Sequence, residues 1–246
     1  MIVIPMAGLS SRFFRAGYDK PKYMLEAHGK TLFDHSVLSF KKYFDSEAFL
    51  FVIRDVHDTL NFVTDRVKAL GIKSFQIVTL DEETRGQAET VYLALKQSGN
   101  IDQSLTIFNI DTFRPNFTFP TESRKGSGYL EVFQGPGDHW SFVEPDPAGS
   151  GRVRRTTEKI RISDLCSTGL YHFSNCQDFI DAFELYSQMP KSQWAKGELY
   201  IAPLYNLTIK QGKNVYYHLI NRDDVIFCGT PSEYQEFTAS GSITRT

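Results

Sequence analysis

The first 110 residues alternate between short apolar runs and amphipathic helical patterns, and no other feature limits the fold as strongly. The apolar runs, each of strand length, lie at 2–5, 48–54, 74–80 and 104–110. The helical patterns between them lie at 31–44, 57–70 and 86–99. Strands that alternate with helices form a mostly parallel sheet with right-handed crossover connections. The chain is therefore predicted to have an α/β fold.

After about residue 126 the pattern changes to strand-like pieces separated by glycine and proline turns. These pieces lie at 129–135, 141–146, 151–160, 167–173, 215–220 and 225–230. Further helices are predicted at 176–189 and 197–212. The chain has 246 residues and no repeat or linker, so a single domain over 1–237 is predicted. The polar residues 238–246 are predicted to form a disordered tail.

Charge and hydropathy argue against several kinds of partner. The chain carries 27 Lys and Arg against 29 Asp and Glu, so its net charge of −2 gives no electrostatic basis for binding nucleic acid or an anionic membrane. No apolar run approaches membrane-spanning length, and the N-terminus lacks the pattern of a signal peptide. Three widely spaced cysteines without a CxxC pair indicate thiols in a reducing compartment. A cytoplasmic protein is therefore predicted.

The first apolar run opens directly into a polar loop over 6–23. Its small residues and its cations are Gly8, Ser10, Ser11, Arg12, Lys20 and Lys22. Small residues let backbone N–H groups approach phosphate oxygens, and fixed cations balance the phosphate charge. A loop that follows a strand of a parallel sheet lies at the edge where ligands bind. The loop is therefore predicted to bind phosphate, with a solvated surface loop as the alternative.

Two further segments lie at the same predicted edge of the sheet. Asp111 follows the run 104–110, and a carboxylate there could hold Mg²⁺, although an aspartate that caps a turn is the alternative. The loop 84–88 precedes the helix 86–99, whose positive N-terminal end would favour an anion or the edge of a base. A helix cap with a flexible glycine is the alternative there.

The stretch IPMAGLSSRF, followed by DKPKYMLEAHGKTLFDHSV, resembles the signature of the sugar-phosphate nucleotidyltransferases. The resemblance extends from residue 2 to about residue 237. It implies a Rossmann-like three-layer sandwich with a mostly parallel central mixed sheet, of the nucleotide-diphospho-sugar transferase (GT-A) type. It also implies a nucleotide-binding half over about 1–115 and an acceptor-binding half over about 116–237.

The resemblance assigns roles to residues of the first half. Arg12 and Lys22 would be catalytic, stabilising the triphosphate of an NTP, and Asp111 would bind Mg²⁺ as the cofactor. The nucleotide-binding residues would be Met6, Ala7, Gly8, Leu9, Ser10, Ser11, Arg12, Lys22, Arg85, Gly86, Gln87 and Asn109.

In the second half, the segments 155–173 and 197–206 resemble family elements that face the acceptor. The acceptor-binding residues would be Glu158, Lys159, Gly169, Tyr171 and Glu198. Lys159 would meet the acceptor phosphate, and Glu158 would accept hydrogen bonds from hydroxyl groups. Glu198 would lie in the first turn of the helix predicted at 197–212. An exposed ion pair on an edge strand is the alternative for Glu158 and Lys159.

Two departures from the family pattern bear most directly on the site. Ser10 stands where the family usually has glycine, so the turn must tolerate a Cβ atom. Phe227 stands where many members have an aspartate that serves as a second metal ligand. Asp223 or Asp224 could compensate, or Asp111 could hold the metal together with phosphate oxygens and water. Alternatively, the aromatic side chain could form a pocket wall.

The predicted activity is a nucleotidyl transfer that joins an NTP to a phosphorylated small acceptor, by default a sugar 1-phosphate, and releases pyrophosphate. The product would be a nucleotide-activated precursor for surface polysaccharide, and the enzyme could form a homodimer. Three alternatives stay open. They are a cytidylyltransferase for choline phosphate or a polyol phosphate, a GT-A glycosyltransferase, and a non-catalytic nucleotide-binding homologue.

Overall fold

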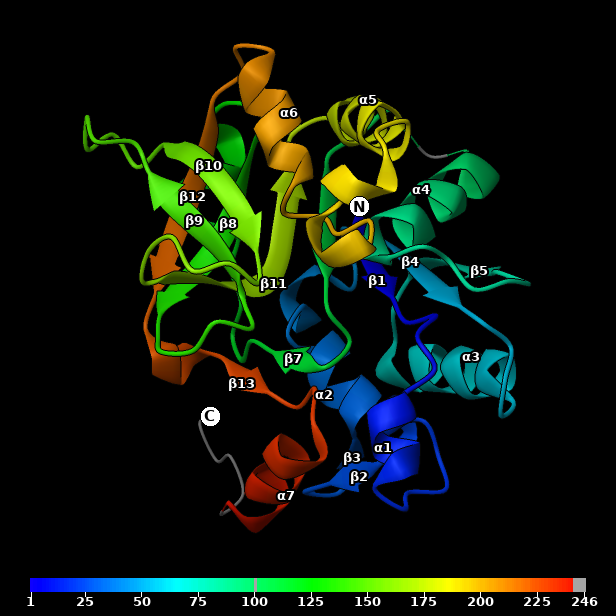
Figure 1. The fold of residues 1–246 in the computed structure, drawn as a ribbon. Helices are drawn as coiled ribbons and strands as arrows, with labels where there is room; N and C mark the ends of the chain where they lie inside the picture. Colours follow the sequence, from blue (N-terminus) through cyan, green and yellow to red (C-terminus); the bar gives the residue numbers. More distant parts are fainter. Residues whose placement is uncertain (100, 241–246) are drawn as a thin grey trace.

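The computed structural model describes residues 1–99 and 101–240, which are built around one nine-stranded mixed sheet (Figure 1). Four strands of the first half are parallel and adjacent, in the order β6-β1-β4-β5. They are β1 (Ile2–Pro5), β4 (Ala48–Ile53), β5 (Ser74–Thr79) and β6 (Leu105–Phe108). These strands match the four predicted apolar runs.

The second half extends the same sheet with mostly antiparallel strands. Its strands are β8 (Gly128–Gln134), β9 (Ser141–Pro145), β10 (Val153–Glu158), β11 (Leu165–Phe173) and β12 (Val215–Ile220). The long strand β11 joins the halves, because it pairs antiparallel with β6 on one side and with β8 on the other. The predicted α/β class with a mixed central sheet is confirmed.

Helices cover both faces of the sheet and give three layers (Figure 1). Along β1, Ile2 and Ile4 face one core and Val3 faces the other, as the two-residue period of a strand requires. The first core includes side chains of α2 (Leu32–Leu38) and α3 (Thr59–Leu70). The second includes side chains of α4 (Gln87–Ser98), α5 (Cys176–Ser187) and α6 (Leu204–Lys210).

Two predicted helices are shorter in the structure. The helix predicted at 31–44 begins at a capping box between Thr31 and Asp34 and ends at Leu38. Phe40 then turns into the core against Phe108, and a 3₁₀ turn, η2 (Lys41–Tyr43), follows. The helix predicted at 197–212 begins only at Leu204, because the residues before it cross the start of α4 in extended form.

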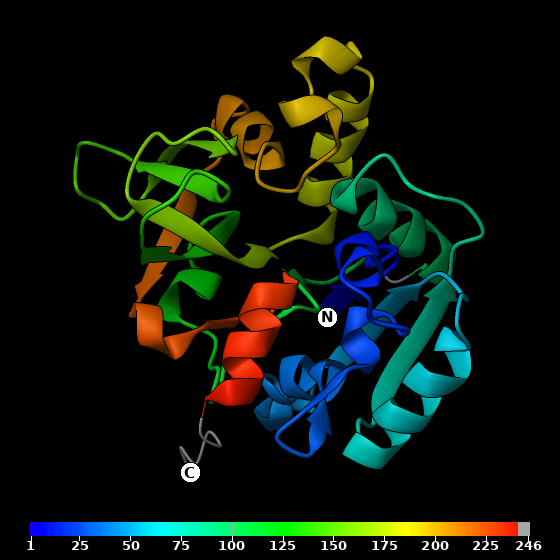
Figure 2. The ribbon, with the colours of Figure 1, turned by 60° about the horizontal axis from the view of Figure 1, so that its bottom comes forward.

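A short two-stranded ribbon carries the chain away from the sheet toward its C-terminus. It pairs β13 (Ile226–Phe227) with β7 (Thr112–Phe113), so most of the strand predicted at 225–230 is absent. The last helix, α7 (Pro231–Ala239), lies beside the hairpin of β2 (Glu26–Ala27) and β3 (Lys30–Thr31) (Figures 1 and 2). The prediction of a disordered tail at 238–246 is wrong for its first two residues, because helix α7 extends to Ala239. Residues 241–246 lie outside the described residues.

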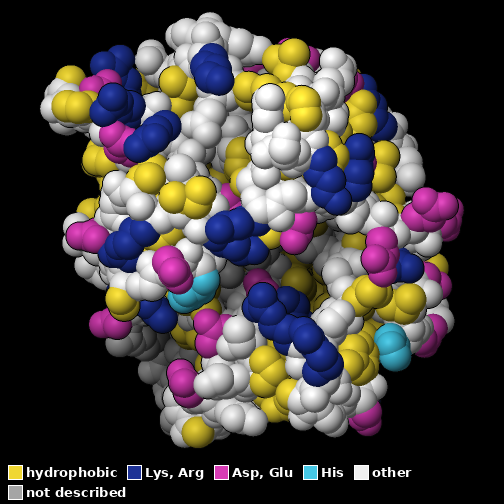
Figure 3. Space-filling model, in the orientation of Figure 1, with side chains coloured by type: hydrophobic (Ala, Val, Ile, Leu, Met, Phe, Trp, Pro, Cys, Tyr) yellow, Lys and Arg dark blue, Asp and Glu magenta, His cyan; other side chains and the backbone are white. Residues whose placement is uncertain are grey.

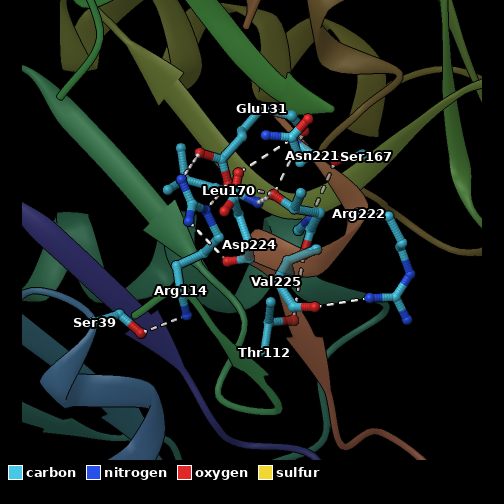
Figure 4. Close-up of polar contacts among 12 residues, drawn as sticks. Ser39, Thr112, Arg114, Glu131, Ser167, Leu170, Asn221, Arg222, Asp224 and Val225 are labelled. Carbon is cyan, nitrogen blue, oxygen red and sulfur yellow. Dashed lines mark hydrogen bonds and ion pairs between the residues drawn. The ribbon is translucent and has the colours of Figure 1, made fainter. Parts of the chain in front are cut away.

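A buried ion pair fastens this C-terminal segment to the sheet (Figure 4). Arg114 donates from Nε to Glu131 Oε1 at 2.7 Å and from Nη2 to Oε2 at 3.1 Å. Its Nη1 donates to the carbonyl of Asp224 at 2.8 Å. The Glu131 side chain is 0% exposed and that of Arg114 is 10% exposed. The guanidinium thus joins strand β8 to the turn η6 (Arg222–Asp224) that precedes β13.

In the part of the chain that the structure describes, no helix is both long enough and apolar enough to cross a bilayer. The cysteines Cys166, Cys176 and Cys228 are buried free thiols. Burial raises the pKa of Cys176 to about 11 and that of Cys228 to about 12, so both thiols are protonated at neutral pH.

Candidate active site

Two adjoining cavities open where β1 and β6 end, at the carboxyl edge of the parallel strands. Their volumes are about 690 Å³ and about 710 Å³. Lys22, Asp111 and Glu198 are among the residues that line both, so the two cavities form one cleft. In Figure 3 a hollow opens near the middle of the face, with Lys and Arg side chains along its rim. The position agrees with the ligand site of open α/β sheets.

Residues of the loop after β1 line both cavities of the cleft. Ser10, which stands where the family usually has glycine, has a structural role in this loop. Ser10 adopts a left-handed conformation with φ 52° and ψ 28°, which costs a non-glycine residue about 1 kcal/mol or more. The Ser10 hydroxyl accepts a hydrogen bond from the backbone N–H of Lys22 at 3.1 Å. This bond offsets part of the strain and ties the start of the loop to the lysine at its end.

Lys22 and Asp111 meet at the centre of the cleft. Lys22 Nζ lies 2.5 Å from Asp111 Oδ2, and both side chains are about one-fifth exposed. The carbonyl of Asp111 accepts a hydrogen bond from the N–H of Cys228 at 2.7 Å. Gly229 lies against the carboxylate, since a Cβ atom there would be 3.0 Å from Oδ2. Three distant segments therefore fix one cation and one carboxylate between the two cavities.

The predicted loop residues divide between the two cavities. Met6 and Ala7 line the first, whereas Gly8, Leu9, Ser10 and Ser11 line both. Arg12 is exposed and lines the second, and Arg15, which was not predicted, lies beside it. The loop thus brings two arginine side chains to the cleft in addition to Lys22.

Gly86 is needed where the segment before α6 crosses the start of α4. Its φ is 152°, and a Cβ atom there would lie 2.5 Å from the carbonyl oxygen of Leu199. Leu199 donates to the Arg85 carbonyl and accepts from the Ala88 N–H, both at 2.9 Å. The close approach of Gly86 in this structure is therefore to protein backbone, although Gly86 also lines the first cavity.

An amide pair forms a wall of the first cavity. Gln87 Nε2 donates to Asn109 Oδ1 at 2.6 Å, and both residues line the cavity. Gly169, with φ 89°, leaves room for this pair, because a Cβ atom there would lie 2.3 Å from Asn109 Nδ2. Gly169 thus connects strand β11 to the predicted nucleotide-binding residues, and it also lines the second cavity.

Of the predicted nucleotide-binding residues, Arg85 is the one that the structure does not bring to either cavity of the cleft. Its Nε donates to Glu89 Oε1 at 2.7 Å, one helical turn further along the chain. Its guanidinium lies 5.4 Å from the ring centre of Trp194. These contacts hold the side chain along the outer face of α4.

Glu158, Ser141 and Tyr171 form a buried polar group in the second cavity. Ser141 Oγ donates to the Glu158 carboxylate and lies 3.1 Å from Tyr171 Oη. Glu158 is 7% exposed, so the alternative of an exposed ion pair is wrong for it. Burial raises the pKa of the Glu158 carboxyl, and burial together with the Glu158 charge raises the pKa of Tyr171 to about 12.

Lys159 and Glu198 lie differently from their predicted places. Lys159 has a left-handed backbone with φ 54°, and its Nζ donates to Tyr200 Oη at 2.5 Å. Among the described residues that line the two cavities, Tyr200 and Glu198 are present and Lys159 is not. Glu198 follows the 3₁₀ turn η5 (Ala195–Gly197) and precedes α6 by several residues, so its predicted place in a first helical turn is wrong.

Phe227 forms part of an aromatic wall of the second cavity. Its ring centre is 4.6 Å from that of Trp140, and the guanidinium of Arg222 lies 4.9 Å from it. Asp223 and Asp224 line neither cavity, which argues against either as a substitute metal ligand. Within the described residues no group of three or more His, Cys, Asp or Glu side chains could hold a metal ion.

Sequence reasoning missed Glu233 as a cavity residue. Glu233 lines the second cavity, and both Glu233 and Asp111 lie close to Gly229. The Oε2 atom of Glu233 accepts a hydrogen bond from the Thr230 N–H at 2.9 Å, which caps helix α7. The Thr230–Glu233 spacing is a capping-box pattern, which identified neither a cavity nor a ligand. Tyr200, whose aromatic ring could serve a sugar face, also lines the second cavity.

An open α/β sheet whose first strand leads into a loop of small residues and cations, facing a carboxylate, defines a nucleotide-binding enzyme of the Rossmann-like class. The chain is 59% identical to a nucleoside-diphosphate-sugar pyrophosphorylase from Vibrio cholerae RC9, with a TM-score of 0.94 over 98% of this chain and 100% of that one. This protein belongs to the sugar-phosphate nucleotidyltransferase family.

More distant solved structures share the fold. A UDP-glucose pyrophosphorylase, complexed with UDP-glucose, is 15% identical with a TM-score of 0.70 over 96% of each chain. The inositol-1-phosphate CTP transferase from T. maritima is 14% identical with a TM-score of 0.72 over 96% of this chain and 94% of that one. No protein-family model and no curated protein sequence matches the chain.

Proposed function

We propose that the protein joins an NTP to a sugar 1-phosphate and releases pyrophosphate. An oxygen of the acceptor phosphate would attack the α-phosphorus, and the bond from that phosphorus to the pyrophosphate oxygen would break. The observation that supports this most strongly is the Lys22–Asp111 pair, which stands between two cavities large enough for two substrates. The 59% identical relative is named for the same chemistry.

The loop after β1 and its cations suit the triphosphate. Transfer at phosphorus needs positioning and stabilisation of charge on the phosphate oxygens, and it needs no covalent intermediate. Lys22 is fixed by Asp111 and by the bond from its own N–H to Ser10, whereas Arg12 is exposed at the rim. We assign Lys22 to charge that develops at the α-phosphate, and Arg12 to the outer phosphates.

The residues of the cleft fit Mg²⁺ as the cofactor. Mg²⁺ is bound in many nucleotide enzymes by one or two carboxylates together with substrate phosphates and water. Asp111 offers one carboxylate in the cleft, and Phe227 removes the second that the family pattern led us to expect. Asp111 would hold the ion, which would neutralise phosphate charge.

The second cavity suits the acceptor. Glu158 and Glu198 can accept hydrogen bonds from sugar hydroxyls, and the rings of Trp140 and Phe227 can pack against a sugar face. We assign the amide groups of Gln87 and Asn109, which line the first cavity, to the edge of the base. A homodimer and use of the product for surface polysaccharide are further proposals, as is the cytoplasmic location that the cysteine content favours.

The test is pyrophosphate release with Mg²⁺ from each common NTP in combination with a panel of acceptors. The NTP is chosen first by thermal shift, because a ligand that binds the folded state raises the midpoint of unfolding. The panel contains sugar 1-phosphates, choline phosphate and polyol phosphates. Release with a sugar 1-phosphate supports the proposal. Binding of an NTP without release in any combination would show a non-catalytic homologue instead.

Replacing Glu158 by glutamine tests the acceptor site and has a pH signature. Burial raises the pKa of the Glu158 carboxyl above its ordinary value of 4.5. The group therefore contributes its full stability at pH values below 4.5, and this contribution is lost as pH rises through the raised pKa. We expect E158Q to raise the midpoint of thermal unfolding at pH 7 and to leave it unchanged near pH 4. Loss of a charged hydrogen-bond acceptor should lower kcat/KM for the acceptor roughly ten- to a hundred-fold. An equal loss of kcat/KM for the NTP would contradict the assignment.

A further inference from the structure

Tyr200 stands in the second cavity at the end of a chain of polar groups that begins at Lys159. The Lys159 ammonium donates to Tyr200 Oη at 2.5 Å, and Glu198 acts on the same phenol through its charge and a hydrogen bond. Tyr200 and Glu198 line the cavity, whereas Lys159 does not. The ammonium therefore contacts the phenol, and the phenol borders the cavity.

Both ends of the Lys159–Tyr200 contact are held by backbone. Lys159 has the left-handed φ of 54°, and its N–H donates to the Trp140 carbonyl at 2.8 Å, which fixes the direction in which its side chain leaves β10. Tyr200 follows Leu199, whose two backbone hydrogen bonds anchor this segment to the start of α4.

The phenol remains a neutral hydrogen-bond donor in this setting. Burial, followed by the charges of Glu198 and Glu158, raises the pKa of Tyr200 well above its ordinary value. The ammonium donates to the phenol oxygen and polarises the O–H, and the O–H donates in turn to Glu198, which lines the same cavity. An oxygen of an acceptor bound in the cavity would compete with Glu198 for this O–H.

We propose that Tyr200 contacts the acceptor directly and that Lys159 acts on the acceptor through Tyr200, as a positioning residue. The inference rests on the proposed function of the second cavity as the acceptor site. It differs from the family expectation for Lys159, in which the ammonium itself meets the acceptor phosphate.

A double-mutant cycle distinguishes the two arrangements. We expect Y200F to raise KM for the acceptor about ten-fold, with kcat and KM for the NTP within about two-fold of the wild-type values, because one hydrogen bond to the acceptor is lost. K159M should raise the acceptor KM by a similar factor. The double variant should be no worse than the worse single variant, because residues that act as one unit are not additive. If K159M fails to fold, K159Q replaces it in the cycle.

The chain supplies a matched control away from the cleft. Tyr92 Oη donates to Glu184 Oε1 at 2.8 Å, and Lys96 Nζ lies 3.3 Å from the same carboxylate oxygen, so this group has the same three residue types. Y92F removes the same hydroxyl and should leave both KM values unchanged.

Three results would overturn the inference. The first is a double variant whose acceptor KM rises by the product of the single effects, about a hundred-fold, because Lys159 would then bind the acceptor independently. The second is an unchanged acceptor KM in Y200F. The third is a parallel rise of both KM values in Y200F, which would indicate a general structural effect. Failure of the proposed function itself would show differently, as wild-type protein that releases no pyrophosphate.

Discussion

Replacement of Glu131 by leucine is expected to lower the free energy of unfolding by about 3–5 kcal/mol, because it leaves the buried Arg114 guanidinium without its counter-charge. The carboxylate accepts two hydrogen bonds from Arg114 and one from the Thr168 hydroxyl at 3.1 Å, and its side chain is 0% exposed. Urea unfolding at pH 7, followed by circular dichroism, measures the change.

The double variant R114M/E131L provides the control. Well-packed apolar residues in place of a buried ion pair are often neutral or stabilising, so the double variant should regain most of the lost stability. Two costs remain: the carbonyl of Asp224, a half-buried residue, loses its donor, and the buried Thr168 hydroxyl loses its acceptor. A single E131L variant that loses less than about 1 kcal/mol would show that water reaches Arg114 and that the pair contributes little.

Replacement of Lys22 by methionine is expected to lower kcat about 10²- to 10³-fold, the usual effect of removing one preorganised donor from developing charge. Lys22 lines both cavities and is held 2.5 Å from Asp111, so no other cation of the loop can take its place without rearrangement. Initial rates of pyrophosphate release at saturating substrates measure the loss.

Lys20 is the matched control for Lys22. It lies two residues earlier on the same loop, is exposed and lines neither cavity. K20M should keep kcat within about two-fold of wild type, since an exposed charge outside the cleft is screened by salt. Equal losses in K20M and K22M would show that the loop contributes general positive charge and that the Lys22–Asp111 geometry is unimportant.

The N-terminal half of the fold could be predicted from the sequence because each signal there is local. Apolar runs of strand length alternate with amphipathic patterns, and Gly71 and Gly99 end their helices in left-handed conformations, as glycine commonly does. The helix at 197–212 was placed too early because its apolar spacing does not reveal the crossing at Leu199. That crossing depends on Gly86, more than a hundred residues away, and a local pattern cannot contain it.

The same distinction holds for the site. The loop with Lys22 and the strand end with Asp111 each carry a local signal, and the fold brings them to 2.5 Å. The roles of Ser10 and Phe227 needed the structure, because one depends on a hydrogen bond to Lys22 N–H and the other on packing against Trp140. The contact between Tyr200 and Lys159 could not be found from sequence, since the two residues lie 41 positions apart.

The crossing of Leu199 over Gly86 has a consequence for how this enzyme could change its substrates. Gly86 lies in the cavity proposed for the base, and the backbone that blocks a side chain at position 86 leads directly to Tyr200 in the cavity proposed for the acceptor. A larger residue at 86 would displace the wall of the other pocket. A substitution at position 86 that altered the preference for the nucleotide would therefore also alter the preference for the acceptor. The two specificities cannot evolve independently at this position.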